Sequence, residues 1–160
     1  MEKVKELIIK ANKSLKTADH LTYITYKLVN DPKLTIAILE NINLTLVSAM
    51  EAVLHFDRLF KRIQPYPQNF DSKFQVFKES CVPRYNISTK HLILIQEIKS
   101  ILEKHKESPM EFIRKDKFVI ASSAYRLQTI SINTIKKYLA DTKDFMEEVK
   151  NIFRENARLF

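Results

Sequence analysis

The chain has 160 residues, no glycine, no tryptophan, one cysteine and a formal net charge of +8. This length suits one domain with a substantial core, and a single cysteine excludes an intramolecular disulfide and any metal site built on several cysteines. The lack of glycine excludes phosphate-binding loops that need a bare backbone, and it argues against a fold rich in tight hairpins.

The first part of the chain predicts two long helices. Asp31 can cap the second helix, with Pro32 at its first position, and this helix is expected to run to about residue 63. Its broad apolar stripe predicts a central position with neighbours on two sides. The first helix is expected from about residue 2 to about residue 30, with a stripe formed by Val4, Ile8, Ala11, Leu15, Ala18, Leu21 and Leu28.

Shorter elements are expected after a proline-containing loop. Asp71 can cap a short helix that reaches about residue 80, and Pro83 is expected to end it. Ser88 can cap a fourth helix through about residue 106.

The hydrophobic period changes in the last third of the chain. A capping box at residues 108–111 predicts a short helix or turn. Residues 117–121 and 126–130 are β-branched and aromatic, which predicts a small hairpin around a polar turn at residues 122–125. Ser131 or Asn133 can then cap a last helix through about residue 157.

Together these elements predict a single all-α domain over residues 1–160. We expect an antiparallel bundle of about five helices, because short links favour antiparallel neighbours. A small β-hairpin near residues 117–130 is attached to it through about residues 115–131.

Signals for a membrane, a metal or a cofactor are weak. The N-terminal residues alternate in charge, and no stretch reaches the roughly 18–20 uninterrupted apolar residues of a membrane span. Metal-binding patterns of Glu-x-x-His or His-Glu-x-x-His do not occur. Asp141, Asp144 and Glu148 share one helical face, which we interpret as a solvated face. We therefore expect a cytoplasmic protein with no membrane contact, no metal and no cofactor.

The basic excess favours phosphate binding, because each neutralised phosphate releases counterions. Tyrosines lie among the basic residues and can stack on unpaired bases. The same charge suits an acidic protein partner equally well, so RNA and protein both stay open. The residues predicted to contact RNA are Arg58, Lys61, Arg62, Tyr66, Tyr85, Asn86, Lys90, Arg114, Lys115 and Lys117.

Arg84 and His91 stand seven positions apart around the predicted start of the fourth helix. A neutral histidine can accept the proton of a ribose 2′-hydroxyl, and an arginine can stabilise the phosphorane-like transition state without a metal. His91 also shares an apolar stripe with Ile95 and Ile98, so a core-edge histidine bonded to a neighbour is the alternative interpretation.

The Arg84-x6-His91 spacing resembles the motif of the HEPN superfamily, in which an arginine is followed after four to six residues by a histidine. Residues 14–21, followed by a long second helix, also look like the opening of such domains, so the resemblance covers about residues 1–107. It implies an all-α bundle, catalytic or RNA-binding roles for Arg84 and His91, and often a homodimer in which two motifs meet. Tyr85 departs from the polar residue that the family often has after the arginine.

Three functions follow from these observations. The first is a basic module that binds RNA or a protein partner, as a homodimer. The second is a metal-independent endoribonuclease, with His91 as general base and Arg84 holding the phosphate. The third is a non-catalytic scaffold or antitoxin-like domain, which needs only the apolar stripes and no reactive site.

Overall fold

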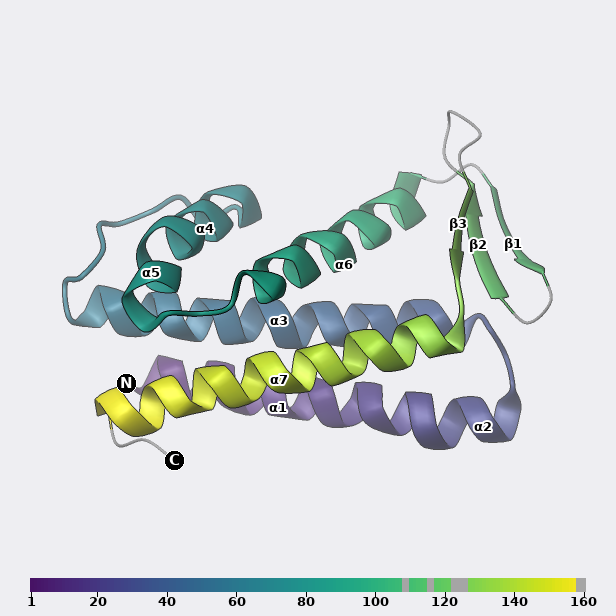
Figure 1. The fold of residues 1–160 in the computed structure, drawn as a ribbon, viewed down its shortest axis with the longest axis horizontal. Coiled ribbons are helices and arrows are strands. Elements are labelled where there is room, and N and C mark those ends of the chain that lie inside the picture. The colour runs from purple at the N-terminus through teal and green to yellow at the C-terminus, as the bar shows by residue number, and fades with distance from the viewer. Residues whose placement is uncertain (108–109, 115–116, 122–126, 158–160) are drawn as a thin grey trace.

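The computed structural model describes residues 1–107, 110–114, 117–121 and 127–157. Within these ranges it contains five helical stretches and one small antiparallel sheet, which confirms the all-α bundle with an attached hairpin. The four long stretches lie along the longest axis and consecutive ones run antiparallel, while the sheet lies at one end (Figure 1).

The first stretch consists of α1 (Glu2–His20), a π-helical turn (Leu21–Thr25) and α2 (Tyr26–Val29). The predicted stripe is correct for its buried positions up to Ala18, but Leu28 is 81% exposed. Thr22 and Tyr26 are buried instead, and they continue the face of Ala18 in steps of four residues. Leu28 was wrongly placed on the stripe, because two residues beyond Tyr26 the helix has turned by about 200°.

The second stretch, α3 (Leu34–Leu59), is the central helix and packs against α1, α6 and α7, as predicted. It begins later than predicted because Asp31 closes a turn first, its carboxylate accepting the Lys33 N–H at 3.0 Å. It ends earlier because Lys61 adopts a left-handed backbone with φ of 54°.

By length and composition, α3 is the one described helix that is long and apolar enough to cross a membrane. In the fold, 56% of its most apolar 18-residue window is buried inside the bundle.

The third stretch consists of α4 (Phe70–Val76), a π-helical turn (Phe77–Cys81) and α5 (Val82–Tyr85). Asn69 caps it in place of Asp71, since its side chain accepts the Ser72 N–H at 2.8 Å. Pro83 does not end the helix as predicted. It lies in the first turn of α5, directly after the π-helical turn Phe77–Cys81.

The remaining elements are α6 (Thr89–Glu107), β1 (Met110–Arg114), β2 (Lys117–Ala121), β3 (Leu127–Ile130) and α7 (Ile132–Ala157). The β2–β3 hairpin is confirmed, and Phe118 lies opposite Ile130 in its register. The short helix or turn predicted at residues 108–111 is wrong where it is described: Met110 and Glu111 belong to β1, which pairs along β2. A strand there satisfies the backbone of the β2 edge. Residues 108 and 109 and the predicted turn at 122–125 lie outside the described residues.

The sheet is anchored to the bundle by its own apolar side chains. Phe118, Ile120 and Ile130 are buried in the same core as the helices. Ser131 caps α7 as predicted, because its hydroxyl accepts the Thr134 N–H at 3.2 Å.

Asparagine and lysine take the helix-ending positions that glycine commonly fills. Asn30, Lys61 and Asn86 have φ between 52° and 54°, and they are the described residues with positive φ. Around Lys61, the Arg62 N–H donates to the Asp57 carbonyl at 2.8 Å. Helices can therefore end sharply in a chain without glycine.

A test of this packing compares Phe153 with Leu28. The Phe153 ring is fully buried and meets Phe56 edge to face at 5.4 Å. Phe153→Ala should lower the free energy of unfolding by about 3–5 kcal/mol in urea denaturation, through lost burial and the cavity left behind. Leu28→Ala is the matched control and should change it by less than about 0.5 kcal/mol. Similar losses in the two variants would contradict this arrangement of α1, α3 and α7.

Candidate functional site

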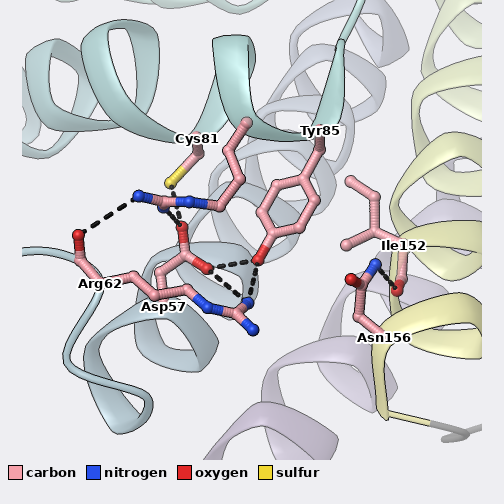
Figure 2. A network of polar contacts seen from close by, with 7 residues as sticks. Asp57, Arg62, Cys81, Tyr85, Ile152 and Asn156 are labelled. Atoms are coloured by element: carbon pink, nitrogen blue, oxygen red, sulfur yellow. Dashed lines mark hydrogen bonds and ion pairs between the residues drawn. The ribbon is translucent and has the colours of Figure 1, made fainter.

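Asp57 is a buried carboxylate near the end of α3, with an exposed fraction of 0%. Its oxygens accept hydrogen bonds from Arg84, Tyr85 and Cys81, with the Cys81 sulfur at 3.3 Å (Figure 2). Arg62 forms an ion pair with the same carboxylate at 3.5 Å. A buried carboxylate is costly unless it is paired and hydrogen-bonded, so these four side chains make the position of Asp57 tolerable.

The two arginines and Tyr85 also bond to one another. Arg62 Nη1 donates to the Tyr85 hydroxyl at 2.9 Å, and Arg84 Nη2 donates to the Arg62 carbonyl at 3.3 Å. The arginine side chains are 35% and 32% exposed, so one edge of each guanidinium faces Asp57 while part of the side chain reaches solvent. We call Asp57, Arg62, Cys81, Arg84 and Tyr85 the Asp57 network; it ties α5 to the end of α3.

Burial raises the pKa of the Cys81 thiol, and the neighbouring Asp57 carboxylate raises it further. Burial likewise raises the pKa of Tyr85, with the hydrogen bond to Asp57 as the next cause. Since the thiolate is the nucleophilic form, Cys81 is an unreactive buried thiol in this setting.

His91 lies in the first turn of α6 and is 1% exposed. Its Nε2 lies 2.5 Å from Oε2 of Glu148 on α7, and its ring centroid is 5.1 Å from that of Phe145. Glu148 also accepts the Ser88 N–H at 3.1 Å, so one carboxylate holds both the histidine and the start of α6. The Nδ1 atom has no hydrogen-bond partner among the described residues.

Arg84 and His91 are held by different carboxylates on different helices. No hydrogen bond or ion pair joins them in the described part of the chain. A general base must come within hydrogen-bond reach of its substrate proton, and the buried His91 ring offers no such access. The geometry agrees with the alternative interpretation of His91 as a core-edge histidine bonded to a neighbour.

Several residues predicted to contact RNA are already engaged. Tyr66 is buried, with the Arg58 guanidinium 5.9 Å from its ring centroid. Tyr85 belongs to the Asp57 network, and Lys90 forms an ion pair with Asp144 at 3.6 Å. Neither tyrosine is therefore presented as an open stacking platform for a base.

The other predicted RNA contacts lie at two ends of the molecule. Arg58 and Lys61 are exposed where α3 ends, and Asn86 is exposed where α5 ends. Arg114 and Lys117 belong to β1 and β2, at the opposite end of the bundle (Figure 1). Lys115 lies outside the described residues, and of Arg114 only the backbone is described. The predicted basic surface is therefore not one continuous site.

A groove of about 550 Å³ lies between α1 and α7, and we call it the α1–α7 groove. Leu15, Ile24 and Met146 supply its aliphatic lining. Its charged lining consists of Lys16, Asp19, Lys143, Glu147 and Lys150. A second hollow along α1 shares Lys16 and His20 with the groove and extends it to Ile9.

The sequence interpretation missed this groove. Ile9, Tyr23 and Ile24 lie off the apolar stripe of the first helix and are exposed. Apolar residues on the outer face of an amphipathic helix were the available signal, because a contiguous exposed apolar patch marks an interaction surface.

Comparison with known proteins finds no family model that matches the sequence, and no match among curated proteins or solved structures. The resemblance to the HEPN superfamily stays a prediction.

Replacing the central carboxylate tests whether the Asp57 network holds the fold. Asp57→Asn should lower the free energy of unfolding by about 2–3 kcal/mol, less than the roughly 3–5 kcal/mol for breaking a fully buried pair, because both guanidiniums can gain water. Urea denaturation measures this loss, and Asp144→Asn on the exposed face of α7 is the control. Equal stability of Asp57→Asn and the wild type would show that the network contributes nothing.

The raised pKa of Tyr85 predicts a loss of stability in alkali. The folded protein keeps the phenol proton above about pH 10, where the tyrosines of the unfolded chain lose theirs. The stabilising contribution is therefore complete below that pH and is lost as the pH rises through the folded-state pKa.

Tyr85→Phe should accordingly lose less unfolding free energy than the wild type between about pH 9 and pH 11, as measured by urea denaturation. Parallel pH profiles for the two proteins would contradict the placement of the phenol. Tyr66 and Tyr138 also have raised pKa values through burial, so the Tyr85→Phe profile should still slope downward.

Proposed function

We propose that this chain is a non-catalytic binding module that captures a protein partner through the outer face of its first helix and the α1–α7 groove. The observation that carries the proposal is the aliphatic surface there. Ile24 is exposed in the lining of the groove, and Ile9 is exposed in the adjoining hollow along α1. Such side chains gain from leaving water only when another apolar surface covers them.

The Asp57 network supports the non-catalytic part of the proposal. The Arg84 guanidinium forms an ion pair with the Asp57 carboxylate, and the buried His91 ring is bonded to the Glu148 carboxylate. An endoribonuclease that used this pair would need the buried His91 ring to leave Glu148 and the Arg84 guanidinium to turn from the buried Asp57 toward RNA. That rearrangement would leave Asp57 and Glu148 without these partners, which is costly for the buried Asp57 carboxylate.

The choice of protein over RNA rests on the chemistry of the exposed surface. Unpaired bases stack on aromatic rings, and the tyrosines predicted for that role are engaged elsewhere. Aliphatic side chains next to lysines suit a protein surface with apolar and acidic residues.

The test uses two isoleucines of matched chemistry. Ile24 is 48% exposed at the groove, and Ile93 is 63% exposed on α6 away from it. The immobilised full chain is incubated with nuclease-treated native extract, and retained proteins are quantified by mass spectrometry. We expect one protein to be retained by the wild type and by Ile93→Glu, and to be reduced by about tenfold or more with Ile24→Glu.

Two further measurements use the same proteins. Single-stranded RNA should stay intact in excess EDTA, and its affinity for the wild type should be weak at about 200 mM salt. Equal loss of the retained protein in the two isoleucine variants would contradict binding through the α1–α7 groove. Cleavage of RNA by the wild type but not by the Arg84→Ala, His91→Ala double variant would restore the endoribonuclease.

A further inference from the structure

Positive charge in the α1–α7 groove is not balanced by its own acidic residues. Asp19 is paired with Lys143 at 2.6 Å, and Glu147 reaches Arg154 at 3.9 Å. Lys16 and Lys150 form no ion pair with any residue that the structure describes. Both acids are thus committed, and two lysines of the lining remain without a counter-charge.

The same imbalance continues along α1. Lys13 lines the adjoining hollow and likewise has no ion-pair partner within the described ranges. From Ile9 to Ile24 the helical face extends over about 22 Å, at about 1.5 Å per residue. This length matches about four turns of a second helix laid alongside.

Resting on the proposed function, we propose that the α1–α7 groove binds an amphipathic helix of the partner protein, with an aliphatic stripe flanked by acidic residues. The stripe covers the exposed Ile24 and the half-buried Leu15 in the manner of helix-in-groove recognition. The acidic side chains meet Lys16 and Lys150, where they replace water around charges that nothing in the described chain neutralises.

Other occupants fit the groove less well. A second copy related by a two-fold axis would place a surface with the same excess of lysines against this one. Single-stranded RNA would need an aromatic ring for stacking, and the exposed Tyr23 already has the ammonium groups of Lys136 and Lys143 at 5.5 and 5.7 Å from its ring centroid. An anionic lipid surface takes up protruding apolar side chains, whereas Leu15 of this lining is half-buried and Met146 is buried.

The experiment selects peptide ligands of the groove from a library. A displayed library of helical peptides of about 16 residues carries a fixed aliphatic stripe at helical spacing, and its flanking positions are randomised among Glu, Gln and Lys. It is selected on the wild type, on a Lys16→Glu, Lys150→Glu double variant, and on a Lys104→Glu, Lys106→Glu control near the end of α6. Glu should be enriched about tenfold over Lys on the wild type and the control, and Lys should be enriched on the groove variant.

Each outcome separates this inference from the proposed function. Enrichment of Lys, equal recovery of all three residues, or unchanged Glu enrichment on the groove variant would overturn the acidic helix. If the acidic helix is rejected but retention of the protein in the isoleucine experiment still depends on Ile24, the proposed binding function remains valid. Binding of phosphatidylserine vesicles or single-stranded RNA that is abolished by the groove variant, without peptide enrichment, would assign the groove to a lipid surface or to RNA.

Discussion

The buried charge of Asp57 is the constraint on which the rest of the structure depends. A carboxylate with no solvent exposure needs opposite charge and hydrogen-bond donors around it. Arg62 supplies them from the loop after α3, and Cys81, Arg84 and Tyr85 supply them from the π-helical turn and α5. The third helical stretch is therefore fixed against α3. Arg84, which the sequence pattern offers as a catalytic group, is bonded to Asp57 as part of that support.

A second contact with a carboxylate, between His91 and Glu148, joins α6 to α7. The carboxylate binds the imidazole and the Ser88 N–H just before α6, where a negative charge also suits the helix dipole. Both candidate catalytic side chains are therefore bonded to carboxylates of the chain itself, the buried Asp57 and the half-buried Glu148. The α1–α7 groove is a surface where exposed apolar side chains lie beside lysines that have no ion-pair partner among the described residues.

Periodicity was enough to predict the helices, the central place of α3, the β2–β3 hairpin and the Ser131 cap, because these depend on residues close in the sequence. Periodicity could not predict that Arg84 and His91 are bonded to carboxylates, since these carboxylates lie 27 and 57 positions away in the sequence. Strand β1 was not predicted, because it forms by pairing with the edge of β2. The groove forms between two helices at opposite ends of the chain. Its only signal in the sequence was therefore the isoleucines that lie off the apolar stripe of the first helix.

The most direct measurement of the central claim is a double-mutant cycle between Asp57 and Arg84. The free energies of unfolding of Asp57→Asn, Arg84→Gln and the double variant are compared with that of the wild type by urea denaturation. The account predicts a coupling energy of about 1–3 kcal/mol, because each substitution removes the partner of the other. Additive losses within about 0.5 kcal/mol would mean that Arg84 is not held by Asp57, and would leave its guanidinium available for a phosphate.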